Sequence, residues 1–228
     1  MIKQFIKILI YICKNKTINS KKPRLLKKSN SQAGQESFVC FYNDYKLDGT
    51  YVEIGSGDPI SGNNTYLLET RYNYFGVGID LDFELIGRYN SCRSNIGICE
   101  DATQINYSKL FETFKFPTQI DYLQIDIDPP SQSLKALQNI LQTKFRFTTI
   151  TFEHDLYKST SNSTIVNESR ELLKNANYNL IFSEVKYKNS AFEDWYIDNN
   201  YLDLRKFDDF QCNNLEYWKN FNLFMRIR

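Results

Sequence analysis

The hydrophobic positions alternate between short apolar runs and longer amphipathic segments. Five runs rich in β-branched and aromatic residues cover 50–55, 74–80, 95–101, 120–128 and 145–155. Segments of helical spacing follow each run, at 61–73, 83–91, 103–115, 131–143 and 163–176. Apolar strands that alternate with helices are typical of a parallel sheet covered by helices on both faces. Two last runs, 178–188 and 192–198, lie close together and predict an antiparallel hairpin at the sheet edge.

Acidic residues follow all five of the predicted parallel strands. In open α/β sheets the ligand binds at the carboxyl ends of the strands, where the loops leave the sheet. Carboxylates that crowd together repel one another, so they require hydroxyl groups, amines or a metal ion as partners. The acids at these ends are Glu53 and Asp58, Asp80, Glu100 and Asp101, Asp126 and Asp128, and Glu153 and Asp155.

The loop after the first strand contains two glycines, Gly55 and Gly57, in the segment EIGSG. Glycine lets the backbone approach a ligand closely, but the segment lacks the full G-x-G-x-x-G spacing of a dinucleotide site and any Walker lysine. Asp80 ends the next strand, where an acid commonly receives two ribose hydroxyls. The pattern therefore favours an adenosine-type ligand without a pyrophosphate.

Five ordered motifs carry a resemblance to the FkbM-type branch of class I S-adenosylmethionine-dependent methyltransferases. They are SQAGQESFV, YVEIGSGDPISGNNTYLLE, DYLQIDIDPPSQSLKAL, ITFEHDLY and FEDWYID, within residues 31 to 198. The resemblance implies a Rossmann-like fold, a mostly parallel sheet with an antiparallel C-terminal hairpin, and S-adenosylmethionine as cofactor. It also implies that Glu53, Gly55 and Gly57 surround the methionine half, that Asp80 binds the ribose, and that Asp101 and Ala102 contact the adenine. From the residues alone we expect Asn64 and Thr65 to cap the following helix.

Methyl transfer to a hydroxyl needs a general base or a metal ion that acidifies the hydroxyl. Asp126 and Asp128 are two residues apart, so a continuing strand would point both to one face. The arrangement is similar to that of macrocin-type metal-dependent sugar O-methyltransferases, which would make Asp128 and Glu153 ligands of Mg²⁺ or Mn²⁺. The candidate catalytic residues are Asp126, which would lie nearer the cofactor, and His154, the only histidine of the chain, which is the candidate general base. The expected acceptor is a sugar or glycan.

Three other functions remain open from the residues. DPPS at 128–131 resembles the signature of amino-methyltransferases of nucleic-acid bases, but Ser131 replaces the stacking aromatic residue. A glycosyltransferase could use the D-x-D segment, although it would not need the glycine loop and Asp80. A non-catalytic nucleoside-binding module would share every feature of the fold. The acidic body and the missing ring lead us to expect no nucleic-acid partner.

Charge divides the chain into two parts that the net charge of +1 conceals. Residues 1–28 hold nine Lys or Arg and no acid, whereas the remaining 200 residues carry 19 basic and 27 acidic residues. We therefore separate a basic N-terminal helix or linker, 1–30, from a methyltransferase domain, 31–228. The N-terminal segment is too short to span a bilayer, and it is either an interfacial helix at a membrane or a surface helix with a basic linker. Five scattered cysteines without a C-x-x-C pair indicate a reducing, cytoplasmic location and argue against structural zinc.

Overall fold

A computed structural model of the chain describes residues 29–159 and 162–201. The basic segment predicted over 1–30 lies almost wholly outside the described residues, as does the part of the predicted methyltransferase domain from 202 to 228. Among the described residues, none of the helices combines the length and the apolar character that crossing a membrane requires.

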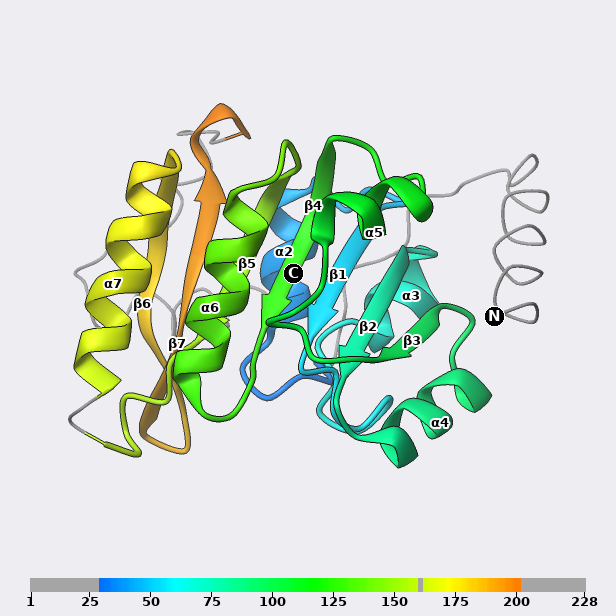
Figure 1. The fold of residues 1–228 in the computed structure, drawn as a ribbon, viewed down its shortest axis with the longest axis horizontal. Helices are drawn as coiled ribbons and strands as arrows, with labels where there is room; N and C mark the ends of the chain where they lie inside the picture. Colours follow the sequence, from blue (N-terminus) through cyan, green and yellow to red (C-terminus); the bar gives the residue numbers. More distant parts are fainter. Residues whose placement is uncertain (1–28, 160–161, 202–228) are drawn as a thin grey trace.

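One seven-stranded sheet forms the centre of the fold, in the order β3-β2-β1-β4-β5-β7-β6 (Figure 1). β1 to β5 are parallel, and β7 runs antiparallel between β5 and β6. This arrangement confirms the predicted α/β class and the predicted hairpin, with β6 rather than β7 at the edge. The bounds are β1 Thr50–Ile54, β2 Phe75–Asp80, β3 Ile96–Cys99, β4 Gln119–Ile125, β5 Arg146–Glu153, β6 Tyr178–Tyr187 and β7 Ser190–Asp198.

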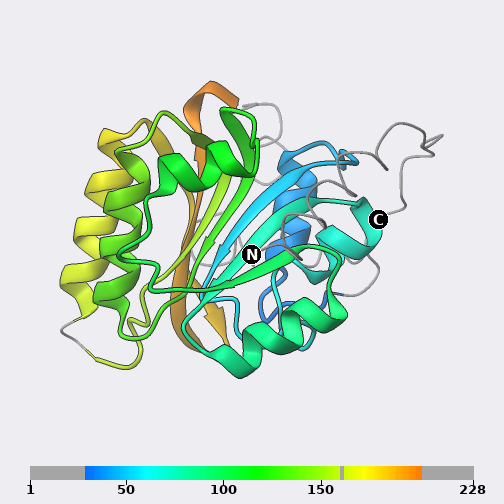
Figure 2. The same ribbon diagram turned by 45° about the vertical axis from the view of Figure 1, so that its right-hand side comes forward.

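Helices cover both faces of the sheet and bury two apolar clusters (Figures 1 and 2). Side chains alternate along β1, so that Val52 and Ile54 join the cluster beneath α5, α6 and α7, whereas Tyr51 joins the cluster beneath α2 and α3. α4 packs on β2 and β3. The bounds are α2 Gln35–Tyr42, α3 Tyr66–Tyr72, α4 Phe83–Cys92, α5 Tyr107–Thr113, α6 Pro130–Leu141 and α7 Asn162–Asn175.

The tryptophan of the FEDWYID motif belongs to the second of these clusters. Trp195 is fully buried, and its ring centroid lies 4.9 Å from that of Phe38 and 5.4 Å from that of Phe182. Core packing therefore accounts for this residue, and it offers no surface on which a sugar could stack.

Candidate functional site

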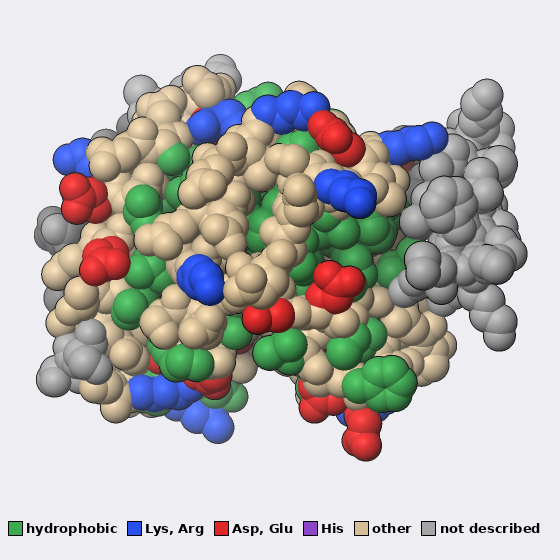
Figure 3. Space-filling model, viewed as in Figure 1, with side chains coloured by type: hydrophobic (Ala, Val, Ile, Leu, Met, Phe, Trp, Pro, Cys, Tyr) green, Lys and Arg blue, Asp and Glu red, His purple; other side chains and the backbone are tan. Residues whose placement is uncertain are grey.

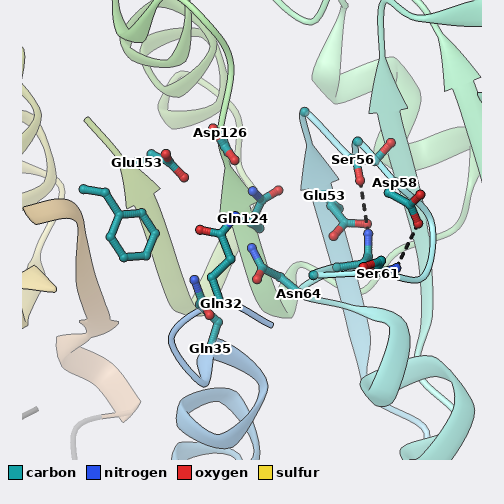
Figure 4. A pocket seen from close by; sticks show the side chains of 15 residues that line it. Gln32, Gln35, Glu53, Ser56, Asp58, Ser61, Asn64, Gln124, Asp126 and Glu153 are labelled. Atoms are coloured by element: carbon teal, nitrogen blue, oxygen red, sulfur yellow. Dashed lines mark hydrogen bonds between the residues drawn. The ribbon is translucent and has the colours of Figure 1, made fainter. Parts of the chain in front are cut away.

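Two neighbouring pockets lie at the carboxyl ends of the parallel strands, as the fold predicts. The larger pocket, of about 350 Å³, lies among the ends of β2, β3 and β4. The smaller pocket, of about 130 Å³, lies among the loop after β1, the segment that precedes α2, and the ends of β4 and β5 (Figure 4). Gly55 and Asp126 are the two residues that line both pockets. The space-filling view shows a hollow at this edge of the sheet with acidic side chains beside it (Figure 3).

Gly55 allows the loop after β1 to lie directly against the end of β4. Its φ is +74°, and a Cβ atom at this position would lie 1.6 Å from the carbonyl oxygen of Asp126. Any other residue would therefore separate the two strand ends. Gly57 also has a positive φ, and its backbone N–H donates to Asp80 Oδ2 at 2.9 Å. The glycine loop thus contacts Asp80, the acid that was predicted to bind the same ligand.

The three residues predicted to bind the nucleoside line the larger pocket together. Asp80 accepts one backbone hydrogen bond on each oxygen, from Gly57 and from Asp82, which leaves further lone pairs for a ligand. Asp101 accepts hydrogen bonds from the hydroxyl and the backbone N–H of Thr103, and these bonds hold its pKa below the usual range. Ala102 is buried beside it. Ile79, Leu81 and Ile127 add apolar surface to the same pocket, and Leu81 is 66% exposed.

Glu53 projects from β1 into the smaller pocket. It is buried, and its Oε2 accepts a hydrogen bond of 2.8 Å from the hydroxyl of Thr65. Burial raises the pKa of Glu53 to about 7. The prediction that Asn64 and Thr65 cap the next helix is wrong, because α3 begins without a side-chain cap and the Thr65 hydroxyl turns to Glu53 instead. Asn64 lines the pocket, and its Oδ1 is buried without a partner.

Asp126 lies between the two pockets and faces Glu153. The two side chains share a hydrogen bond, and Glu193 of β7 lies opposite Glu153 in the sheet register. Burial raises the pKa of Asp126 and raises that of Glu153 much further, with Coulomb repulsion inside the cluster adding to the effect on Glu153. The pair therefore holds one proton over a wide pH range, and Asp126 is the member that ionises first.

The predicted metal site is not assembled. β4 ends at Ile125, so the strand alternation that placed Asp126 and Asp128 on one face does not reach either residue. Asp128 is exposed and pairs with Lys158 Nζ at 3.1 Å, whereas Glu153 turns toward Asp126. Within residues 29–159 and 162–201, no group of three or more His, Cys, Asp or Glu side chains is spaced to hold a metal ion.

His154 does not face the candidate site, contrary to its predicted role as a base. Its ring is fully buried and lines neither of the two pockets. Nδ1 accepts the backbone N–H of Leu156 at 3.3 Å, so Nε2 carries the proton and donates to Asp194 at 3.4 Å. Burial opposes the charge of Asp194, yet the hydrogen bonds from His154 and Arg170 lower its pKa to about 2. His154 is thus a structural partner of a buried ion pair.

Sequence reasoning gave no role to several residues of the smaller pocket. Gln124 is a polar residue in an otherwise apolar strand, and that contrast was the available signal. Its Oε1 is buried without a partner. Gln35, which lies in a family motif, donates from Nε2 to Glu193 Oε1 at 2.6 Å. Phe192 at the start of β7 completes the wall.

Comparison with known proteins gives matches only at the level of structure. No family model matches the chain, and no curated protein matches its sequence. A putative rRNA-methylase from Clostridium thermocellum superimposes with a TM-score of 0.52 at 13% identity, over 75% of this chain and 97% of that one. The chain has a Rossmann-like methyltransferase fold.

Two further neighbours of this methyltransferase fold are more distant. The Dnmt2 methyltransferase of S. pombe is 20% identical, with a TM-score of 0.47 over 66% of this chain, which spans about half (49%) of that protein. The fibrillarin of Aeropyrum pernix, solved with natively bound S-adenosyl-L-methionine, is 12% identical, with a TM-score of 0.47 over 67% of each chain. The FkbM-type resemblance rests on the five motifs alone and stays a prediction.

Proposed function

We propose that the protein transfers a methyl group from S-adenosylmethionine to a hydroxyl group of a sugar or glycan. The observation that carries this proposal is the junction of the two pockets at Gly55 and Asp126. A ligand that occupies both pockets must pass this junction, so its central atoms lie beside the Asp126 carboxylate. In S-adenosylmethionine the central atom is the sulfonium that bears the methyl group.

The residues at hand fit this cofactor on both sides of the junction. The larger pocket offers the two oxygens of Asp80 to ribose hydroxyls, and its apolar surface suits an adenine ring. The smaller pocket offers the Glu53 carboxyl group to the ammonium of the methionine end. Ser56 Oγ and Asn64 Oδ1, both buried without partners, are polar atoms that this end would satisfy.

Asp126 is the group that we assign to proton removal. The acceptor hydroxyl would give its proton to an Asp126 oxygen. The bound cofactor would supply the methyl group, whose bond to sulfur would break as its bond to the hydroxyl oxygen forms. Glu153 keeps its own proton and stabilises the Asp126 carboxylate by a hydrogen bond. Alignment of the two reactants supplies much of the remaining rate.

Binding of S-adenosylhomocysteine, the product of the cofactor, tests the first half of the proposal. Calorimetric titration should give a single site per chain, and Asp80→Ala should weaken binding at least tenfold because it removes the acceptors of the ribose hydroxyls. Glu112→Ala is the matched control, since Glu112 is an exposed acid of α5 that pairs with Lys144. If the full chain does not bind S-adenosylhomocysteine, the proposal is wrong.

A transfer assay with labelled S-adenosylmethionine tests the second half. Free sugars, glycans and RNA are offered as acceptors, each with and without EDTA, so that dependence on a divalent metal ion is measured separately. We expect label on a sugar or glycan hydroxyl. Label on RNA alone would support the base methylation that DPPS resembles. Tight cofactor binding without transfer to any of these acceptors would instead support the non-catalytic module.

A further inference from the structure

The methionine end of S-adenosylmethionine carries a carboxylate as well as an ammonium group. The Glu53 carboxyl group suits the ammonium, whereas a carboxylate needs N–H or O–H donors. In the part of the chain that the structure describes, no Lys, Arg or His lines the smaller pocket. The carboxylate therefore needs an uncharged donor from the pocket wall.

The backbone of the loop after β1 has already used most of its donors. In a backbone nest, successive N–H groups point at an anionic ligand. Here they point at oxygens of the protein instead. The N–H groups that donate in this way are those of Gly55, Ser56, Gly57, Ile60, Ser61, Asn63 and Thr65. The donor for the carboxylate is therefore sought among the side chains.

Two glutamines line the smaller pocket, from the first turn of α2 and from the segment that precedes it (Figure 4). Gln35 is engaged, because its Nε2 donates to Glu193 Oε1 at 2.6 Å. Gln32 is exposed, and its side chain forms no hydrogen bond with another described residue, so its amide has two N–H donors to offer. The amide of Asn64 has a buried, unpartnered oxygen, which suits the ammonium rather than the carboxylate. Gln32 is therefore the side chain of this wall that best suits the carboxylate.

The segment that carries Gln32 is fixed to the loop after β1. Asn30 Nδ2 donates to the carbonyl oxygens of Ile60, at 2.5 Å, and Asn63, at 3.1 Å. Ser31 forms a parallel β-bridge with Gly62. Because Gln32 follows Ser31 directly, these contacts hold it at the pocket.

Glu36 organises this segment from the first turn of α2. Its carboxylate is fully buried and accepts four hydrogen bonds from the segment. The donors are the hydroxyl of Ser29 at 3.1 Å, the backbone N–H of Asn30, the backbone N–H of Ser31 at 3.1 Å, and the hydroxyl of Ser31. Since all four converge on one carboxylate, its removal would release the segment from α2.

We propose that the Gln32 amide donates to the carboxylate of the cofactor's methionine end, and that Glu36 is a positioning residue that holds Gln32 there through Asn30 and Ser31. The inference rests on the proposed function, since it names how that site recognises one end of its cofactor. Gln32 touches the ligand, whereas Glu36 acts only through the segment. A hydrogen bond from an amide to a carboxylate is charge-assisted and is stronger than one between neutral groups.

Two ligands that differ only in the carboxylate test the contact with Gln32. Calorimetric titration of the full chain compares S-adenosylhomocysteine with its decarboxylated analogue, which keeps the ammonium group. The unchanged protein should bind S-adenosylhomocysteine at least about fivefold more tightly. Gln32→Ala should weaken that binding at least about fivefold and change the affinity for the analogue less than about twofold.

Three results would overturn the contact. They are equal affinity of the unchanged protein for the two ligands, equal weakening of both ligands by Gln32→Ala, and unchanged affinity of Gln32→Ala for S-adenosylhomocysteine. If the unchanged protein does not bind S-adenosylhomocysteine at all, the proposed function is wrong instead.

Asn30→Ala and Glu36→Gln test the positioning role with the same two ligands. Asn30 is half-buried and does not line the pocket, so its replacement by Ala loosens the segment without removing a ligand contact. It should weaken S-adenosylhomocysteine binding at least about threefold and spare the analogue. Glu36→Gln keeps the side-chain size but turns one acceptor into a donor that faces other donors, so it should have the same effect more strongly.

Asn199→Ala is the matched control. Asn199 is exposed, donates to Asn177 Oδ1 at 2.8 Å, and lines neither pocket, so its loss should change neither affinity. Equal weakening of both ligands by Asn30→Ala would show an effect on the fold rather than on the carboxylate and would overturn the positioning role. Unchanged affinity for both ligands in Asn30→Ala would overturn it as well, even if Glu36→Gln fails to fold.

Discussion

Replacement of Arg93 by methionine tests whether the hydrogen bonds of this buried side chain stabilise the loop after β1. Arg93 follows α4 and is buried, with all three guanidinium nitrogens engaged. Nε donates to Glu69 Oε2 at 2.7 Å. The other two nitrogens donate to the Pro59 carbonyl, Asn63 Oδ1, the Tyr51 hydroxyl and the Thr65 hydroxyl, at 2.9 to 3.1 Å. Four of the five acceptors thus belong to β1 or to the loop that lines the smaller pocket.

The expected loss of stability follows from these contacts. Removal of one partner of a buried ion pair typically costs about 3–5 kcal/mol. Glu69 keeps hydrogen bonds from the Ser94 backbone N–H at 2.6 Å and the Tyr51 hydroxyl at 3.1 Å, so the lower end, roughly 3 kcal/mol, applies. For a domain of this size, about 3 kcal/mol lowers Tm by roughly 6–12 °C. Methionine fills part of the volume but satisfies none of the acceptors.

Urea unfolding and calorimetric titration with S-adenosylhomocysteine measure the two consequences of Arg93→Met. We expect the free energy of unfolding to fall by roughly 3 kcal/mol. We also expect the affinity for S-adenosylhomocysteine to fall at least tenfold, because Thr65 and Asn63 lose the guanidinium group that orders them around Glu53. Arg93→Lys should restore little of the stability or of the affinity, since one ammonium group cannot reach five acceptors. Arg146→Met, which breaks an ion pair with Asp198 away from both pockets, should leave affinity unchanged. A loss below about 1 kcal/mol with unchanged affinity would refute the reasoning.

Three other changes address single residues of the site. Gly55→Ala should abolish S-adenosylhomocysteine binding, because the added Cβ would meet the Asp126 carbonyl oxygen. Gly87→Ala is the control: this position of α4 is open, so the change should raise the free energy of unfolding, measured in urea, by roughly 0.5–1 kcal/mol. Asp126→Asn should lower the transfer rate by about 10²–10⁴ and spare cofactor binding. Because burial raises the pKa of Asp126, the rate of the unchanged protein should fall as pH falls through that raised value, above the usual carboxyl range. His154→Asn should cost roughly 1–3 kcal/mol of stability and change turnover less than threefold, and loss of turnover without loss of stability would contradict its structural role.

The elements of the fold were accessible from the sequence because each has its own local signal. Apolar runs with β-branched residues marked all seven strands, and the glycine loop with Asp80 was correctly placed at one sheet edge. The directions in which side chains point beyond the end of a strand could not be predicted from the sequence. Asp126 turns inward and Asp128 outward because the chain bends after Ile125, and no alternation rule applies in a bend.

Contacts between distant strands were equally hidden from the sequence. His154 has the local surroundings of a base, yet its partner Asp194 comes from β7 and fixes the ring away from the pockets. Glu193 reaches Glu153 only through the register of β5 with β7. Such pairings depend on which strands become neighbours, which the order of residues alone does not reveal.

The position of β7 between β5 and β6 also constrains the order of assembly. β6 precedes β7 in the chain, but among the described strands β7 is its only neighbour, so β6 cannot join the sheet until β7 has docked on β5. On the ribosome, the strands that carry the glycine loop and Asp80 emerge first, whereas Phe192 and Glu193 arrive with β7, the last of the described strands to emerge. A nascent chain would therefore build the larger pocket before the smaller one, and the complete site would form only once β7 has brought Phe192 to the end of β5.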